Sequence, residues 1–327
     1  MIPKVSILVP VYNASNYIER CAHSLFQQTF EDIEYIFVND STPDDSIEKL
    51  QKTIEQYPCR KDNVKIINHE TNKGASASRQ TGIDNSTGNY ILFVDNDDWI
   101  NTDMIATMYK KAIEENADIV VCDYIVEKNN NSEYRMDYVS DNNRDYFRDM
   151  LENKLCVGYL WNKMIHRIFF ELSDCRFNEN LNIVDDFFAL IRIYYYVKKC
   201  VKIDTAFYHY NKQNSYAQTA SKTKIHYENV ILFYELLEEF LKEKELYEKY
   251  INIVEFSKVS IKSELFIKTH SYQLRKQYAW LFREIEMKYI SQLRFGEKLI
   301  LFFSHYRMYF ITRITQRLLV WKNRKNI

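Results

Sequence analysis

The amino-acid sequence predicts an α/β fold, with a mostly parallel sheet flanked by helices and a helical C-terminal region after it. Over about the first 126 residues, apolar runs of strand length alternate with stretches of helical spacing, a pattern typical of parallel sheets covered on both faces. All four prolines and three of the five glycines lie within the first 88 residues. From Ile225 onward, apolar residues recur at helical spacing and breakers are almost absent.

The elements of the first part follow from these runs. A first strand is expected at 5–12, because this stretch is almost wholly apolar and ends at the polar residue Asn13. Further strands are expected at 33–38, 64–68, 90–94 and 118–126, and helices at 18–26, 45–57, 75–85 and 104–115. Because a helix falls between successive strands, the strands are expected to run parallel.

The second part of the chain is less regular. Residues 127–145 are polar and are expected to form a loose excursion from the fold. A mixed segment follows to about 220, with a helix near 184–198 and a strand near 201–210. We therefore expect one domain at 1–220, divided into 1–126 and 127–220, and a helical region at 221–327.

The composition argues against several classes of protein. A hydrophobic content of 46% indicates a folded core, and the net charge of −1 provides no overall field that favours nucleic acid. The six cysteines are scattered, so reduced thiols of a cytoplasmic protein are expected, not a disulfide frame or a zinc site. A strand pattern follows Met1–Lys4 directly and no run of about 18 apolar residues occurs, so neither a signal peptide nor a membrane-spanning helix is expected.

The acidic cluster Asp95–Asp98 is the most informative motif, and it directly follows the apolar run 90–94. Crowded carboxylates repel each other and raise each other's pKa unless a cation neutralises them. Hard oxygen ligands favour Mg²⁺ or Mn²⁺ over softer metals. The cluster therefore predicts a divalent metal that serves a phosphate, and the alternative is a solvated acidic turn.

Two other strand ends also carry polar residues, namely Asn13 and Asn39-Asp40. Ligands of parallel α/β sheets bind beyond the carboxyl ends of the strands. Packing does not explain why three strand ends at one edge are polar. We therefore predict a single ligand site at this edge, which includes the acidic cluster.

The order of these motifs resembles family 2 glycosyltransferases. The matching residues are Val5–Asn13, Val38–Ser41, Asn72–Gly74 with Arg79, Gly82 and Gly88, and Asp95–Asp98. The resemblance covers about residues 4–125 and continues weakly to about 215. Asn39 departs from the Asp-Asp pair that is common in the family.

This resemblance implies the GT-A fold, which is Rossmann-like, and an inverting transfer from a nucleotide-sugar donor. Residues 1–126 would bind the donor, and 127–220 would supply the acceptor side and the base. The family favours a UDP-sugar over GDP- or dTDP-sugars. It also implies a glycan or lipid-linked glycan acceptor in bacterial surface polysaccharide synthesis.

The first two strand ends would hold the nucleoside of the donor. In the family, Asp40 corresponds to a residue that accepts a hydrogen bond from the nucleobase, and Tyr12 would cover the base with its ring. Pro10 and Asn13 would shape the turn. The alternative for Asp40 is an Asx-turn or a helix cap before the next helix.

Arg79 would bind a donor phosphate, because a guanidinium can contact phosphate oxygens in bidentate fashion. The small residues Ala75–Ser78 that precede it allow a close approach of helix and sheet. The alternative is a surface arginine that pairs with Asp84.

Within the acidic cluster, Asp97 is the expected direct metal ligand. Asp95 would bind the metal through water, or bind hydroxyls of the donor. Asn96 is placed on the donor side with it. Asp98 would hydrogen-bond the transferred sugar or cap the helix that follows Trp99.

The general base is implied to be Asp186, the second residue of an acidic pair whose first residue, Asp185, is the weaker candidate. Aromatic neighbours and a second carboxylate raise the pKa of such a group, whereas a helix N-terminus lowers it. The sequence leaves this balance open. The alternative is that Asp favours the first turn of a helix for structural reasons.

Two acceptor-side candidates come from the same resemblance. Trp161, in the segment Trp161–Lys163, would stack on a sugar face, with core packing as the alternative. Lys212 lies in a polar loop with Asn214 and Ser215 that would close over the diphosphate, although a polar loop needs no function.

The C-terminal stretch 296–327 is basic and aromatic. From Ser291 to Ile327, eight Lys or Arg residues accompany a single acidic residue, Glu297. This pattern predicts an amphipathic helix on an anionic membrane surface, at the inner face of the cell membrane. The alternatives are a helix packed on the core and a dimer contact.

Two other functions remain open. A non-catalytic sugar-nucleotide-binding subunit would keep the donor residues but would need no base. A sugar nucleotidyltransferase could share the metal site, but usually carries a glycine-rich, basic loop after the first strand. Asn13–Asn16 contains neither glycine nor lysine.

Overall fold

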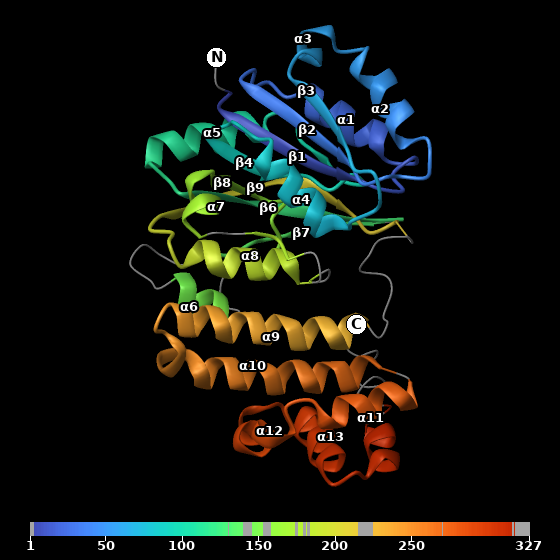
Figure 1. The fold of residues 1–327 in the computed structure, drawn as a ribbon, viewed down its shortest axis with the longest axis vertical. Helices are drawn as coiled ribbons and strands as arrows, with labels where there is room; N and C mark the ends of the chain where they lie inside the picture. The colour runs from blue at the N-terminus through green and yellow to red at the C-terminus, as the bar shows by residue number, and fades with distance from the viewer. Residues whose placement is uncertain are drawn as a thin grey trace. The chain divides into compact units, whose positions relative to one another are not determined.

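The computed structural model describes residues 3–129, 131–139, 146–152, 158–173, 176–178, 181, 184–214, 225–269, 271–315 and 317. The chain divides into two compact units, residues 1–221 and 222–327. The first unit is α/β and the second is helical (Figure 1). The predicted fold class is therefore confirmed.

A sheet forms the centre of the first unit, and nine strands of the described residues belong to it in the order β3-β2-β1-β4-β8-β6-β9-β5, with β7 paired to β6. Its strands are β1 (Val5–Val11), β2 (Ile33–Asn39), β3 (Val64–Asn68), β4 (Tyr90–Phe93), β5 (Trp99–Ile100), β6 (Ile119–Lys128), β7 (Asn131–Arg135), β8 (Lys163–His166) and β9 (Cys200–Asn211). β1–β4, β6 and β9 share one direction, and β5, β7 and β8 oppose it.

The strand order reverses between β1 and β4. The chain builds β1, β2 and β3 outward on one side, and then places β4 against the other side of β1. Such a reversal separates the loops that leave the two neighbouring strands, and ligands bind there. The loops that follow β1 and β4 carry Tyr12-Asn13 and the acidic cluster, so the topology brings the two predicted donor motifs together.

Helices cover both faces of the sheet in the first unit. They are α1 (Ile18–Phe26), α2 (Ser46–Ile54), α3 (Pro58–Lys61), α4 (Ala75–Asp84), α5 (Met104–Glu115), α6 (Tyr146–Leu151), α7 (Ile168–Leu172) and α8 (Asp185–Tyr194). Val5, Ile7 and Val9 of β1 share a core with α1 and α5. Leu8 points to the other face, where Gly82 of α4 packs against it. A strand that is covered on both faces favours apolar residues at nearly every position, which explains the almost wholly apolar run at 5–11. Its one polar residue, Ser6, is buried and donates a hydrogen bond to Glu34 at 2.6 Å.

The segment after β6 differs from expectation. β7 pairs with β6 in antiparallel register, so the described part of 127–145 contains a hairpin where the polar sequence predicted a loose excursion. β8, which lies between β4 and β6, was not predicted, because its first residue Lys163 is polar yet fully buried. The helix expected at 184–198 ends earlier, since α8 spans Asp185–Tyr194.

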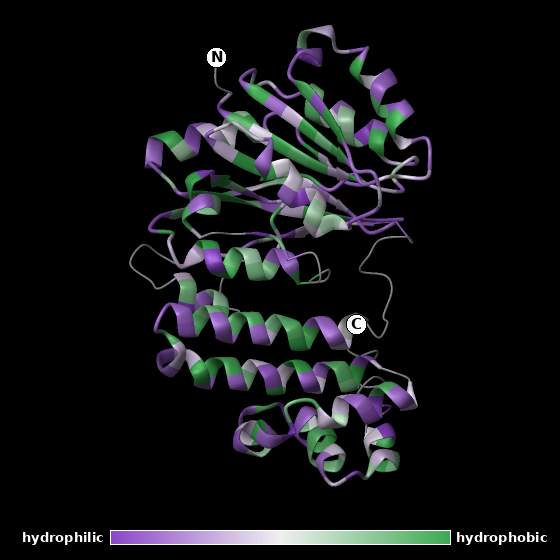
Figure 2. Cartoon of the chain, in the orientation of Figure 1, coloured by the Kyte–Doolittle hydropathy of each residue, from purple (hydrophilic) through white to green (hydrophobic). Residues whose placement is uncertain are grey.

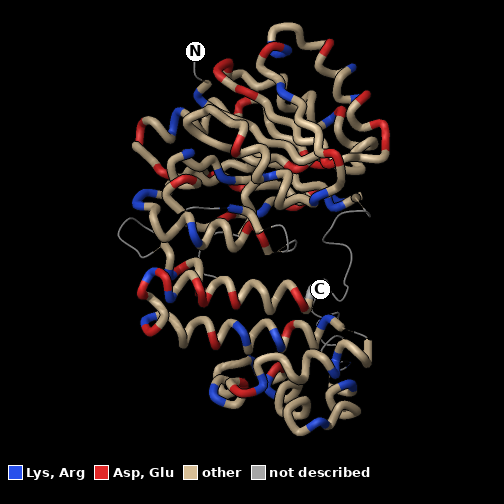
Figure 3. The backbone as a smooth tube through the Cα atoms, viewed as in Figure 1, with Lys and Arg blue, Asp and Glu red and all other residues tan. Residues whose placement is uncertain are grey.

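The second unit contains only helices among its described residues. They are α9 (Ile225–Glu243), α10 (Tyr247–Lys268), α11 (Tyr272–Trp280), α12 (Arg283–Tyr289), a 3-10 turn (Ile290–Gln292) and α13 (Phe295–His305). Their apolar faces form one core that includes Val259, Phe266 and Leu301, and hydrophobic and hydrophilic residues alternate along α9 and α10 (Figure 2). Charges of both signs are spread along both units (Figure 3).

Candidate active site

The acidic cluster forms the turn between β4 and β5, next to the end of β1. Asn96 Nδ2 donates a hydrogen bond to the carbonyl of Pro10 at 2.8 Å. The backbone N–H of Asp98 donates to the carbonyl of Asp95 at 3.1 Å. The N–H of Asp95 in turn donates to Tyr208 Oη of β9 at 3.1 Å. β1 and β9 thus hold the turn from both sides, and Asn96 connects two donor-side segments.

Asp98 is fully buried, and β9 occupies both of its oxygens. Tyr208 Oη and the backbone N–H of Asn211 each donate to it at 2.7 Å. Burial, with the charge of Asp97 beside it, raises the pKa of Asp98 well above its ordinary value. The helix-cap alternative is wrong, because residues 99–100 form β5 and α5 begins only at Met104. In this structure Asp98 holds the end of β9 against the acidic turn, and its contact with a sugar stays a prediction.

Asp95 and Asp97 are the partly exposed carboxylates of the turn. Burial raises the pKa of Asp97 to about 6, with a further contribution from the charge of Asp95. Burial also raises the pKa of Asp95, against the effect of Arg79. Asn214 Nδ2 donates to Asp97 Oδ2 at 2.8 Å.

These two carboxylates fit a hard divalent cation. Both lack full charge compensation, and carboxylate oxygens are the ligands that Mg²⁺ prefers. Mg²⁺ usually takes one or two carboxylates plus substrate phosphates and waters, not an all-protein cage. Among the described residues, no three His, Cys, Asp or Glu side chains form a metal-binding group. The metal assignment therefore stays a prediction.

Arg20 of α1 also lies at the acidic turn, and sequence reasoning missed it. Its Nη2 donates to the carbonyl of Asp97 at 3.1 Å, and its guanidinium lies 3.6 Å from the centre of the Trp99 ring. The Trp99 ring stacks on His209 of β9, with centroids 5.0 Å apart. This stack places a positive charge beside the turn. Nothing in the sequence around Arg20 distinguishes it from an ordinary surface arginine.

Asp40 follows β2 and organises the loop before α4. It accepts hydrogen bonds from the backbone N–H groups of Lys73 at 2.8 Å and Gly74 at 2.7 Å, and Gly74 has the positive φ of 89° that favours glycine. The Asx-turn alternative is wrong for Asp40. Its neighbour Asn39 makes a local contact of a different kind, since Asn39 Oδ1 accepts from the N–H of Thr42, three residues on, at 2.9 Å.

His69, which follows β3, is a second partner of Asp40 that the sequence analysis missed. Its Nδ1 lies 2.7 Å from Asp40 Oδ1 and its Nε2 lies 2.9 Å from Thr81 Oγ1. Two ionised carboxylate oxygens offer about four acceptor positions, and three are used here. Within the described part of the chain, Oδ2 accepts from Gly74 alone and so retains one acceptor position, as binding of a nucleobase N–H requires.

The end of β1 is open to solvent. The side chain of Tyr12 is 42% exposed, so its ring is accessible to a planar ligand. Asn13 adopts a left-handed conformation with φ of 50°, and its N–H donates to Thr42 Oγ1 at 2.9 Å. Pro10, Tyr12 and Asn13 thus form a fixed turn beside Asp40, and their contacts with a donor stay predictions.

Arg79 of α4 is buried among three carboxylates. It lies 2.7 Å from Asp185, 3.3 Å from Asp186 and 3.5 Å from Asp95. Although burial acts in the opposite direction, these carboxylates raise its pKa. The alternative of a surface pair with Asp84 is wrong, because Asp84 accepts from Gln80 instead. Arg79 therefore connects the acidic turn to the predicted base. Its contact with phosphate stays a prediction.

Asp185 and Asp186 begin α8 and differ in their partners. Asp185 Oδ2 accepts hydrogen bonds from Ser76 Oγ at 2.9 Å and from Arg79. Asp186 Oδ1 is buried and receives no hydrogen bond within the described part of the chain. Burial raises the pKa of Asp186 to about 7, which Arg79 opposes and the charge of Asp185 reinforces. The effects that raise the pKa of Asp186 therefore outweigh those that lower it. The pKa lies near neutral pH, as a general base requires.

Trp161 is not available as a sugar platform, because it is only 3% exposed. Its ring stacks on Tyr208 at 4.4 Å, on Tyr159 at 4.9 Å and on Tyr210 at 5.6 Å between centroids. The core-packing alternative is therefore correct for Trp161. Sequence reasoning could not separate the two readings, because both need a large aromatic side chain.

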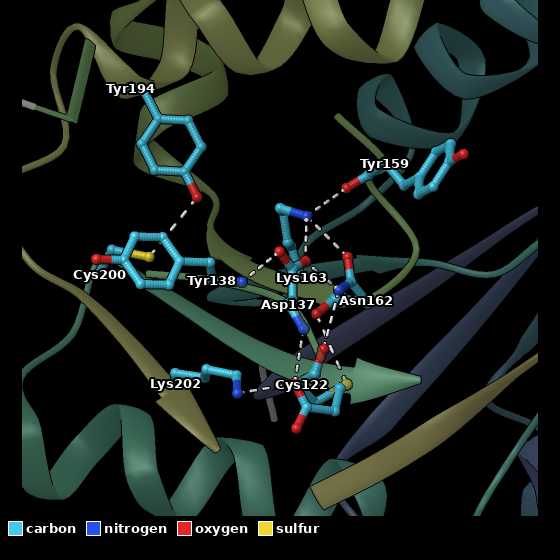
Figure 4. A network of polar contacts seen from close by, with 10 residues as sticks. Cys122, Asp137, Tyr138, Tyr159, Asn162, Lys163, Tyr194, Cys200 and Lys202 are labelled. Atoms are coloured by element: carbon cyan, nitrogen blue, oxygen red, sulfur yellow. Dashed lines mark hydrogen bonds and ion pairs between the residues drawn. The ribbon is translucent and has the colours of Figure 1, made fainter. Parts of the chain in front are cut away.

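The next two residues, Asn162 and Lys163, are fully buried in a polar network (Figure 4). Asn162 Nδ2 donates to Asp137 Oδ2 at 2.6 Å. Lys163 Nζ lies 3.4 Å from the same oxygen and donates to the carbonyl of Tyr159 at 2.8 Å. Buried charges are tolerated when they are paired and hydrogen-bonded. The Trp-Asn-Lys segment therefore supports the loop that precedes it.

Lys212 lies just beyond β9. Its N–H donates to the carbonyl of Glu127 at 2.9 Å, and its Nζ lies 5.7 Å from the centre of the Tyr210 ring. Asn214 in the same loop reaches Asp97, as described above. Ser215 and residues 216–224 lie outside the described residues, so the predicted closure of this loop stays a prediction.

The C-terminal stretch is divided. α13 contributes Ile300 and Leu301 to the core of the second unit. For this part of the stretch, the alternative of a helix packed on the core is therefore correct. Phe295, Phe310 and Ile314 are exposed, and residues 318–327 lie outside the described residues. In the part of the chain that the structure describes, no helix is both long and apolar enough to cross a bilayer.

The sequence of this chain is similar to those of known glycosyltransferases. The profile of Glycosyl transferase family 2 matches residues 6–196. The putative glycosyltransferase EpsH of Bacillus subtilis (strain 168) is 32% identical over 255 residues, which are 76% of this chain and 72% of EpsH. EpsJ of the same organism, an uncharacterized glycosyltransferase, is 35% identical over 192 residues, and the match covers 57% of this chain and 54% of EpsJ.

The fold is also that of a solved structure. The crystal structure of S. aureus TarS 1-349 in complex with UDP-GlcNAc matches with a TM-score of 0.70 at 18% identity, over 98% of this chain and 92% of that chain. At this identity the likeness concerns the fold alone. The family profile, by contrast, spans more than half of the sequence and includes every donor-side residue considered above as well as Asp186. This chain therefore belongs to glycosyl transferase family 2 and is a glycosyltransferase.

Proposed function

We propose that this glycosyltransferase moves a sugar from a UDP-sugar to a hydroxyl group of a glycan or lipid-linked glycan, with inversion at the anomeric carbon. The observation that carries the proposal is Asp186, a carboxylate with a pKa of about 7. Arg79 contacts both Asp186 and Asp95 of the acidic turn, and so joins a base to a donor site. A role in surface polysaccharide synthesis is part of this proposal and rests on the family resemblance.

Asp186 would act on the acceptor. Its Oδ1 lies 3.3 Å from Arg79 Nη1 but accepts no hydrogen bond among the described residues, so it is able to accept the proton of the acceptor hydroxyl. As that proton moves to Asp186, the acceptor oxygen forms a bond to the anomeric carbon. The bond from that carbon to the diphosphate breaks on the opposite face, and the nucleoside diphosphate leaves with the electron pair.

Arg79 would serve both sides of the reaction. Its positive charge lowers the pKa of Asp186, which keeps a fraction of the base ionised near pH 7 despite its burial. Its Nε is buried without a hydrogen-bond partner in the described part of the chain. An arginine with an unused N–H is able to donate to a phosphate oxygen, which would place the diphosphate between Arg79 and the acidic turn.

Different residues of the donor side would bind the nucleoside and the metal. Tyr12 would cover the nucleobase, and the free acceptor position of Asp40 would take the uracil N3–H. Asp97 and Asp95 would hold Mg²⁺ or Mn²⁺, which would neutralise the charge that develops on the departing diphosphate. The fold shared with TarS, which binds UDP-GlcNAc, supports uridine as the nucleoside.

A donor screen tests this function. UDP-, GDP- and dTDP-sugars are incubated with the protein, with and without Mn²⁺, and the released nucleotide is identified. We expect UDP to be released only when a divalent metal is present. Release of pyrophosphate would instead indicate a nucleotidyltransferase, and turnover of GDP-sugars alone would contradict the assignment of uridine.

We also propose that the C-terminal part of the second unit binds an anionic membrane surface, where a lipid-linked acceptor would lie. Phe310 and Ile314 are exposed in a helical segment at 309–315. Burial lowers the pKa of Arg275, and the positive charges of Arg313 and Arg317 add to this effect. An anionic lipid headgroup would relieve this repulsion between arginines.

Vesicle flotation tests the membrane proposal without removing α13, whose residues the core requires. Phe310→Ser combined with Ile314→Ser is expected to weaken binding to vesicles that contain anionic lipid. Ile113→Ser, which changes an exposed apolar residue of α5, serves as the control. Equal flotation of the double variant and the wild type would exclude this surface.

A further inference from the structure

The turn Gly158–Leu160 packs against the start of α8, beside the predicted base. A Cβ atom on Gly158 would lie 2.6 Å from Cδ2 of Phe187, so any other residue here would force the Phe187 side chain to move. Two residues later, the backbone N–H of Leu160 donates a hydrogen bond to Asp186. Tyr159 lies between these two contacts. Its position relative to Asp186 is therefore fixed by its neighbours on both sides.

The ring of Tyr159 stacks on a buried aromatic side chain and is itself partly exposed. It stacks on Trp161 with an interplanar angle of 16°, and Trp161 in turn stacks on Tyr208. Trp161 is buried, but the side chain of Tyr159 is 37% exposed. Burial, together with the nearby charge of Asp186, raises the pKa of Tyr159, in agreement with a ring close to the carboxylate.

The backbone of Tyr159 is held by the buried network of Figure 4. Lys163 Nζ donates to the Tyr159 carbonyl at 2.8 Å and is fully buried beside Asp137. A buried lysine that loses such partners pays a large desolvation penalty, so this contact resists rearrangement. The network therefore fixes an exposed aromatic ring in place before any ligand arrives, which lowers the entropic cost of binding.

We propose that Tyr159 is the platform for the acceptor, and that a pyranoside ring lies on it with one hydroxyl directed at Asp186. The proposal rests on the proposed function of Asp186 as base. The C–H groups of a pyranose carry partial positive charge, and the face of an aromatic ring carries partial negative charge. A pyranoside with an apolar C–H face is therefore the chemical class that fits. Tyr159, which stacks on Trp161, would thus have the sugar-stacking role that was expected for Trp161.

Binding measurements test the platform without requiring turnover. Saturation-transfer NMR and titrations are made with methyl α- and β-pyranosides of glucose, galactose and N-acetylglucosamine, in the presence of UDP and Mn²⁺. Tyr159→Ala is expected to weaken binding of the preferred glycoside by roughly tenfold, the loss of about one aromatic stacking interaction. Tyr159→Phe is expected to bind within about twofold of the wild type, because stacking needs the ring and not the hydroxyl.

Two further variants sharpen the test. Tyr138→Ala removes a more exposed tyrosine, 53% against 37% for Tyr159, and is expected to leave glycoside and UDP binding unchanged. Tyr12→Ala is expected to weaken UDP binding and to leave glycoside binding unchanged, whereas Tyr159→Ala is expected to weaken glycoside binding and to leave UDP binding unchanged. Opposite effects of the two variants on the two ligands would show that the acceptor platform is distinct from the donor site.

Three results would overturn the platform. They are glycoside binding by Tyr159→Ala equal to that of the wild type, a Tyr159→Phe variant as weak as Tyr159→Ala, and wild-type protein that binds no pyranoside of the panel. A failure of the proposed function is distinct, because it would be seen as wild-type protein that consumes no UDP-sugar in the donor screen. Tyr159→Ala is expected to keep the slow hydrolysis of the donor by water, since the donor-side residues are unchanged.

Discussion

The donor side and the base side of the active site are held in different ways. On the donor side, short loops after β1, β2 and β4 place Tyr12, Asp40 and the acidic turn, and backbone hydrogen bonds to side chains fix them. On the base side, Asp186 begins a helix in the second half of the first unit. It is held by an ion pair with Arg79 and by the turn at Leu160.

This difference separates binding from chemistry. The donor loops follow strands of one parallel sheet, and β9 also holds the acidic turn through hydrogen bonds with Tyr208 and Asn211. The base depends on a contact between residues that lie 106 positions apart, in the case of Arg79 and Asp185. A change on one side is therefore expected to affect one kinetic parameter and leave the other intact, which the following experiments examine.

The largest effect is expected from Asp186→Asn, which removes the base but keeps its shape. General base catalysis contributes about 10²–10⁴-fold, so we expect kcat to fall by that range while KM for the UDP-sugar stays unchanged. The matched control is Asp185→Asn, because Asp185 is already hydrogen-bonded by Ser76 and Arg79. A greater loss for Asp185→Asn than for Asp186→Asn would assign the base to Asp185.

A change on the donor side is expected to act on the metal. Asp97→Asn removes the proposed direct ligand, and loss of Lewis-acid stabilisation of several kcal/mol corresponds to roughly 10²-fold in donor turnover. The Mn²⁺ concentration for half-maximal activity is expected to rise, and EDTA to abolish turnover by the wild type. Asp62→Asn, at the exposed end of α3, is the control. Turnover of Asp97→Asn with wild-type metal dependence would contradict the ligand role.

The pH dependence sharpens the comparison with a smaller effect. A base must be deprotonated, so kcat is expected to rise with pH and level off above about 7, the pKa of Asp186. Below that value, kcat falls about tenfold for each pH unit, because the ionised fraction does. Since the charge of Asp185 raises the pKa of Asp186, Asp185→Asn is expected to move the midpoint to lower pH. An unchanged midpoint would mean that another group controls the profile.

The first half of the fold was predictable from sequence because its strands are buried on both faces. A run such as Val5–Val11 has a single polar position, Ser6, and helices of 9–12 residues with apolar faces separate it from the next runs. The polar motifs at the strand ends then predicted where the donor binds. Asp40 shows the limit of such reasoning, because its hydrogen bonds go to the backbone of Lys73 and Gly74, which lie more than 30 residues further along the chain.

The second half was less predictable because tertiary contacts override local pattern there. Lys163 reads as a surface residue, but Asp137 and Asn162 compensate its charge inside the sheet. Residues of β7 are mostly polar and exposed, and among the described strands β7 pairs with β6. Tyr159 and Trp161 are chemically alike, and only the three-dimensional packing shows which of them is exposed.

The position of β8 has a consequence for the order in which the chain can fold. Within the described residues, β4 and β6 do not pair with each other, and residues 163–166 lie between them. A ribosome therefore releases β1–β4 as one sheet and β6–β7 as another, each with an unpaired edge, until β8 emerges. Unpaired edges promote association between chains, so a fragment that stops near residue 129 would keep its donor motifs but expose one edge of β4. The segment that carries the acceptor side is thus also the piece that closes the donor half, and the two cannot be separated by truncation.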